Sequence, residues 1–110
     1  MSEKNELMNA VRGSLIGGAI GDALGYAVEF MREGEIFDTY GDAGITEYDY
    51  RFKKNVAVFS DDTQMTLFTA EGLLNSREDS TSLPRKHIAY AYQSWLMTQF
   101  SKLYEYIDAL

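Results

Sequence analysis

The sequence contains no cysteine, one proline and one histidine among its 110 residues. The absence of cysteine excludes disulfide bonds, thiolate nucleophiles and cysteine-based zinc sites, although it does not identify the cellular compartment. No apolar run approaches the roughly 20 residues that a membrane-spanning helix needs. The first residues, Met1 to Glu6, are polar and charged, unlike the apolar segment of a secretory signal peptide. We therefore expect a cytoplasmic protein with no membrane contact.

Positive charge is scarce: 10 Lys and Arg residues face 17 Asp and Glu residues, and the net charge is −7. Nucleic acids and anionic membranes both bind basic surfaces, so neither is an expected partner. With 45% hydrophobic and 25% charged residues, the composition is that of a globular protein and excludes wholesale disorder. The length corresponds to at most one domain.

Apolar residues between Leu7 and Met31 recur at helical spacing and predict one long helix to about Gly21, continuous or interrupted. Each glycine in this stretch costs up to about 1 kcal/mol of helix propensity, so we expect its small-residue face to pack closely on another helix. These glycines are Gly13, Gly17, Gly18, Gly21 and Gly25. Residues 32–55 have no clear period and predict a long loop with at most a short strand or helical turn.

Two more helices are predicted in the second half of the chain. Residues 62–75 carry a broad apolar face, and the next helix runs from about Arg85 to Gln99. Ser82 is its expected N-cap, and Pro84 stands where a helix start favours proline. Residues 102–110 are expected to form a short amphipathic helix. The predicted fold class is all-α, with about three main helices and a long loop.

Three consecutive oxygen-bearing side chains, Ser60, Asp61 and Asp62, stand where a loop is predicted to become a helix. Such oxygens suit hard divalent cations like Mg²⁺ or Mn²⁺. The alternative is simpler: Ser60 or Asp61 caps the helix, and Asp62 complements the positive end of its dipole. These residues alone do not decide between metal binding and capping.

A second candidate group is the glycine-rich segment 17–25 with Asp22, followed by Glu29. It is not a dinucleotide fingerprint, because no strand precedes it and its glycines do not follow the GxGxxG spacing. Asp22 and Glu29 either meet the Ser60–Asp62 cluster on facing helices or serve ordinary roles, with Asp22 bound to nearby backbone and Glu29 in solvent. His87 is expected in a solvated position, because no second histidine or cysteine is present to share a metal.

Three segments in order resemble the N-terminal part of the ADP-ribosylglycohydrolase family, which includes the dinitrogenase-reductase-activating glycohydrolases and the crystallin J1-like proteins. They are Gly21-Asp22-Ala23-Leu24-Gly25 with Glu29, Ser60-Asp61-Asp62-Thr63-Gln64-Met65, and Tyr92-Gln93-Ser94-Trp95-Leu96 with Thr98-Gln99. The resemblance implies an all-α fold around a dinuclear Mg²⁺ or Mn²⁺ centre. It also implies hydrolysis of the glycosidic bond between ADP-ribose and a protein side chain or small acceptor.

The resemblance further implies a role for individual residues. Ser60, Asp61 and Asp62 match the family's N-terminal metal ligands, with Ser60 where many members have threonine. Glu29 matches the acidic residue implicated in catalysis, either as a general base or as a stabiliser of developing positive charge. Asp22 and Thr63 are expected to lie behind the ligands and support them.

One departure from the family pattern concerns the rest of the site. The family's domain is several times longer, and its other metal ligands lie in an Asp-x-Asp-Thr-like motif that does not follow Gln99 here. We therefore expect residues 1–110 to be an N-terminal portion of the domain with an incomplete site, completed by self-association or by a complementing C-terminal half. The alternative is a catalytically inactive helical module that binds a partner.

Overall fold

The computed structural model describes residues 2–81 and 83–108, with side chains for residues 2–81 and 83–100. Within these ranges the chain forms four α-helices and one 3₁₀ helix and no strand, so the all-α prediction is confirmed. The chain divides into two compact units, Met1–Thr63 and Gln64–Leu110. The expectation of one incomplete domain over residues 1–110 stays a prediction. None of the described helices is long and apolar enough to cross a membrane.

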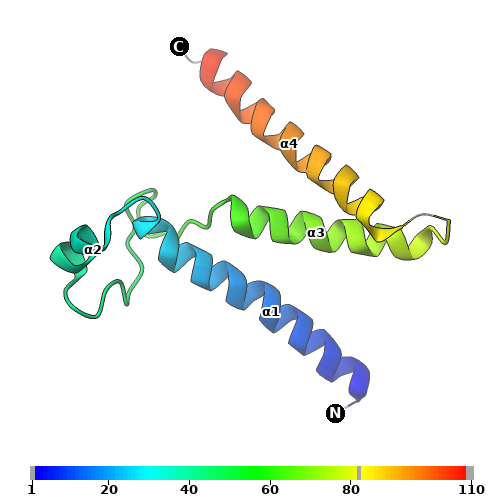
Figure 1. Ribbon diagram of the computed structural model, residues 1–110, viewed down its shortest axis with the longest axis horizontal. Coiled ribbons are helices and arrows are strands. Elements are labelled where there is room, and N and C mark those ends of the chain that lie inside the picture. The colour runs from blue at the N-terminus through cyan, green and yellow to red at the C-terminus, as the bar shows by residue number, and fades with distance from the viewer. Residues whose placement is uncertain (1, 82, 109–110) are drawn as a thin grey trace. The chain divides into compact units, whose positions relative to one another are not determined.

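The first unit begins with helix α1, Glu3–Gly25, which continues as the 3₁₀ helix η1, Tyr26–Val28. Ser2 caps it, because its hydroxyl accepts a hydrogen bond from the Asn5 amide at 3.4 Å. The helix passes through all five glycines without a break and ends four residues beyond the predicted Gly21 (Figure 1). Apart from the backbone of α1 itself, no atom of this unit lies within 4 Å of a Cβ built on any of these glycines. The expected close helix contact is therefore not made inside the unit.

Helix α2, Glu33–Tyr40, corrects the prediction that residues 32–55 contain at most one helical turn. The Arg32 amide donates a 2.7 Å hydrogen bond to the Glu35 carboxylate, which satisfies one of the unpaired donors at the helix start. The helix ends at Gly41, whose φ of 84° favours glycine. An acidic residue three positions after the N-cap Arg32 and a glycine directly after the helix were visible in the sequence as boundary signals.

The irregular segment after α2 is attached to that helix by a three-residue cluster. The Tyr40 hydroxyl donates to Asp49 Oδ2 at 2.6 Å, and Arg51 Nη2 donates to the same carboxylate oxygen at 3.0 Å. Arg51 Nη2 also contacts the Tyr40 hydroxyl at 2.6 Å. Bonding to Arg51 and Tyr40 holds the pKa of Asp49 below its ordinary value. Tyr48 and Tyr50, on the same loop, are exposed.

The second unit contains most of helix α3, Asp61–Glu78, and all of helix α4, Pro84–Asp108. Both were predicted, but α4 continues through the residues expected to form a separate terminal helix. Pro84 is the first residue of α4, as its fixed φ favours. The expected cap Ser82, and residues 109 and 110 of the expected tail helix, lie outside the described residues. From the connection at residues 79–83, α3 and α4 diverge along their lengths (Figure 1).

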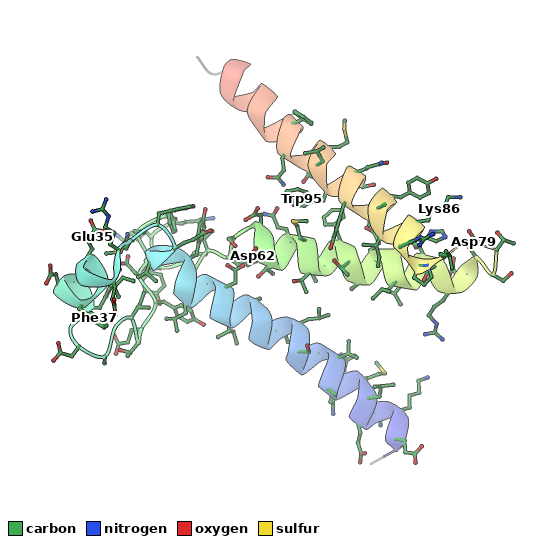
Figure 2. The ribbon with its side chains drawn as sticks, viewed as in Figure 1. Glu35, Phe37, Asp62, Asp79, Lys86 and Trp95 are labelled. Carbon is green, nitrogen blue, oxygen red and sulfur yellow. The ribbon has the colours of Figure 1, made fainter. Side chains whose placement is uncertain are left out.

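The residues at the contact between α3 and α4 become larger from Gly72 towards the start of α3. A Cβ built on Gly72 lies 2.7 Å from the Ile88 Cα and 2.9 Å from the His87 carbonyl oxygen, so the two backbones touch here. One turn towards the start of α3, the Thr69 hydroxyl and the Tyr92 hydroxyl are 2.7 Å apart. Further along, Trp95 Nε1 donates to Gln64 Oε1 at 3.0 Å. Figure 2 shows Trp95 on α4, on the side of this helix that faces α3.

His87 is not in the solvated position that the sequence analysis expected. Its Nε2 lies 3.0 Å from Asp79 Oδ2, and its side chain is 18% exposed. Asp79 also accepts a 2.6 Å hydrogen bond from the Thr81 hydroxyl. Asp79 directly follows the end of α3, and His87 lies in the first turn of α4. Their contact therefore joins the end of α3 to the start of α4.

Candidate functional site

Four residues at the end of α1, in η1 and directly after it are spaced as neighbours on one helical face: Asp22, Gly25, Tyr26 and Glu29. Their spacing of three, four and seven positions is that of neighbours along one side of a helix. They line a pocket of about 180 Å³ whose other wall is formed by Ser60 and Asp62, at the start of α3. All six residues belong to the first unit. The pocket therefore joins the two sequence segments that carry the candidate residues.

The Asp22 carboxylate holds these two segments together. Its Oδ2 accepts hydrogen bonds from the Ser60 amide at 2.9 Å and from the Thr63 amide at 3.2 Å. The Ser60 hydroxyl donates to Oδ1 at 2.7 Å, and the Thr63 hydroxyl donates to Oδ2 at 2.5 Å. Ser60 and Thr63 are buried, with 6% and 7% of their surfaces exposed. Four donors on one carboxylate fix the start of α3 against the end of α1.

The same contacts explain why α3 begins where it does. The Ser60 hydroxyl accepts a 3.2 Å hydrogen bond from the Asp62 amide, so Ser60 is a side-chain cap of this helix. Asp22 adds a carboxylate from a different helix at the positive end of the α3 dipole. Capping does not use the whole hydroxyl, which has one hydrogen and two lone pairs. Its hydrogen goes to Asp22 and one lone pair to Asp62, which leaves one lone pair for another ligand.

Hydrogen bonding keeps Asp22 ionised. Burial alone raises the pKa of its carboxyl group, but the hydrogen bonds from Thr63 and Ser60 together outweigh burial, and the net pKa is below its ordinary value of 3.8. The reason is that all four donors favour the charged form of the carboxylate. Asp22 is thus an anion throughout the physiological range.

We expect a matching pH dependence of the Asp22 contacts. Because the folded-state pKa is lowered, the stabilisation is complete above the ordinary value of 3.8 and is lost as the pH falls through the folded-state pKa. A titration of the ¹³C shift of the Asp22 carboxyl carbon should have its midpoint below 3.8. A midpoint at or above that value would contradict the hydrogen-bonding account.

The other candidate residues are placed differently. Glu29 is exposed and lines the pocket, as does Asp62. Asp61 is exposed in the first turn of α3 and is not among the pocket-lining residues. Thr63 is buried behind the pocket, with its hydroxyl bound to Asp22. Gly25 belongs to the glycine-rich segment already named from the sequence, whereas Tyr26 was missed, although its spacing from Asp22 was a usable signal.

The pocket fits a divalent cation in the type of its donors but not in their number. Carboxylates of Glu29 and Asp62 and the free lone pair of Ser60 are the hard oxygen donors that Mg²⁺ and Mn²⁺ prefer. Over the part of the chain that the structure describes, however, no three Asp, Glu or His residues gather closely enough to hold an ion. These donors by themselves are too few to complete the coordination shell of such an ion.

Comparison with known proteins gives one match. No curated protein and no solved structure is found to be similar. A family model described as ADP-ribosylglycohydrolase matches residues 3–108.

Proposed function

The chain belongs to the ADP-ribosylglycohydrolase family, and we propose that it supplies part of the divalent-metal centre of such a hydrolase. In this proposal Ser60, Asp61 and Asp62 are metal ligands, and Glu29 is the catalytic carboxylate. Asp22 and Thr63 position the ligands without touching the ion. The substrate class is an ADP-ribosylated protein or a related small molecule, with Mg²⁺ or Mn²⁺ as the ion.

The observation that carries the proposal is the pocket shared by Glu29, Ser60 and Asp62. Glu29 and Ser60 are far apart in the sequence, and the hydrogen bonds of Asp22 bring their segments together. Capping alone accounts for Ser60 and Asp22, but it gives no reason for a second carboxylate, Glu29, at the edge of the same pocket.

Charge gives the residues of the pocket a further role. ADP-ribose is a polyanion, and a chain of net charge −7 repels it at long range. A divalent ion reverses the local field and acts as a Lewis acid towards oxygen groups. Asp61 and Asp62 lie in the first turn of α3, where their charges offset the positive helix end that otherwise repels a cation. The remaining donors come, in this proposal, from a second copy or a complementing segment.

A calorimetric titration with Mn²⁺ tests the assignment. We expect the wild-type chain to bind Mn²⁺ and the double variant Asp61→Asn/Asp62→Asn to lose at least about tenfold in affinity, because both anionic donors are removed. The matched control is Asp38→Asn/Asp42→Asn, which changes the net charge equally at two exposed positions outside the pocket.

The comparison of the two double variants decides the result. If both weaken binding by the same factor, Mn²⁺ responds only to overall negative charge and the proposed ligands are wrong. If Asp61→Asn/Asp62→Asn binds like wild type, the metal site lies elsewhere. Circular dichroism of each variant checks that helix α3 is retained, since both substitutions fall in its first turn.

A further inference from the structure

An aromatic stack lies beside the pocket, formed by Tyr26 and Phe52. The rings of Tyr26 and Phe52 have centroids 4.5 Å apart and planes inclined by 24°, which is a stacked pair. Tyr26 lines the pocket, whereas Phe52 does not and lies on the irregular segment that leads to Ser60. The stack is thus a second link between the α1–η1 face and the chain entering α3.

The position of Tyr26 places this link one helical turn from Asp22. The Tyr26 amide donates to the Asp22 carbonyl oxygen, and the Glu29 amide lies 3.4 Å from the Tyr26 carbonyl oxygen. Tyr26 is therefore bonded through its backbone to two of the three carboxylate-bearing residues that line the pocket, Asp22 and Glu29. Its ring therefore lies on the same helical segment as Asp22 and Glu29.

A single attachment leaves a segment free to pivot, whereas two attachments fix its direction. The Asp22 hydrogen bonds hold Ser60 and Thr63, and the stack holds Phe52 eight residues earlier in the chain. We propose that Tyr26 and Phe52 are positioning residues: their stack fixes the irregular segment so that Ser60 and Asp62 face Glu29 across the pocket. This inference deepens the proposed metal site and rests on it for its functional meaning.

Phe52→Ala tests the proposal in the full chain. The variant should accelerate amide hydrogen exchange at Ser60 and Thr63 about threefold to tenfold, the range expected for the loss of one aromatic pair. Its affinity for Mn²⁺ should fall by a similar factor. Phe52→Tyr keeps the ring and should restore wild-type values for both measurements. Because Phe52 is 52% exposed, neither variant is expected to unfold the chain.

Phe30→Ala is the matched control, because Phe30 lies next to Glu29 in the sequence and is 89% exposed. Removing its ring therefore removes little buried surface. It should leave exchange at Ser60 and Thr63 unchanged. Wild-type exchange in Phe52→Ala, or failure of Phe52→Tyr to restore it, overturns the positioning role. If the wild-type chain binds no Mn²⁺, the metal proposal fails, while the exchange measurements still decide whether the stack positions this segment.

Discussion

Replacing Gly72 with alanine is expected to destabilise the α3–α4 unit by about 2–3 kcal/mol, as overpacking of a close contact does. The added Cβ would lie 2.7 Å from the Ile88 Cα and 2.9 Å from the Ile88 amide nitrogen. Both are backbone atoms of α4, so no side-chain rotation relieves the overlap and the helices must move apart. The steric cost exceeds the gain of roughly 1 kcal/mol in helix propensity that alanine offers over glycine.

Trp95 is the measurement site for this prediction. It is the only tryptophan in the sequence, and it bonds to Gln64 across the same helix pair, so its fluorescence reports separation of α3 from α4. The control is Gly13→Ala in α1, where nothing lies within 4 Å of the added Cβ. That variant should be more stable by up to about 1 kcal/mol in the free energy of unfolding, followed by circular dichroism. If Gly72→Ala and Gly13→Ala change the stability in the same direction, Gly72 is not a close-contact position.

The helices that could be predicted from the sequence are those with long apolar periodicity. Helices α1, α3 and α4 carry this periodicity over many turns, so the prediction of a helix in each of these segments was correct. Their ends were less accurate, and the short helix α2 was missed because eight residues contain too few turns for a period to stand out. Its start depends on one hydrogen bond to Glu35, which is local chemistry rather than periodicity.

The two groups of glycines show a second limit of the sequence. Five glycines in α1 predicted a close helix contact, yet within their own unit nothing approaches them. The single glycine in α3, Gly72, is where two helix backbones meet. Spacing along one helix reveals which residues share a face, but not which face another helix approaches. That information depends on pairs of residues distant in the chain.

Part of the candidate site was predictable for a different reason. Some residue types strongly favour one kind of position or ligand, such as serine at a helix start and clustered carboxylates around a cation. Ser60 and the neighbouring carboxylates could therefore be recognised as candidates from the sequence. The four hydrogen bonds that converge on Asp22 could not, because they join residues about 40 positions apart along the chain. The same applies to the Tyr26–Phe52 stack.

Asp22→Asn is expected to weaken the attachment of residues 60–63 to α1 by about 2–3 kcal/mol, because buried donors lose a charged acceptor. Asparagine has nearly the same shape, but its amide nitrogen is a donor and cannot accept from Ser60 or Thr63. Those amides and hydroxyls, all within 3.2 Å of the carboxylate in the native chain, are then only partly satisfied. Amide hydrogen exchange at Ser60 and Thr63 should accelerate about 30-fold or more, beyond the effect of Phe52→Ala.

The control for charge is Asp38→Asn, an exposed carboxylate of helix α2 in the same unit, which should change stability by less than about 0.5 kcal/mol. Asp22→Asn should also abolish the loss of stability caused by Asp22 protonation below pH 3.8, since the titrating group is gone. If exchange at Ser60 and Thr63 stays at the wild-type rate in Asp22→Asn, the carboxylate does not hold the start of α3. In that case the hydrogen bonds of Asp22 are not what brings Glu29 and Asp62 to the same pocket, and the Tyr26–Phe52 stack would be the remaining link between the two segments.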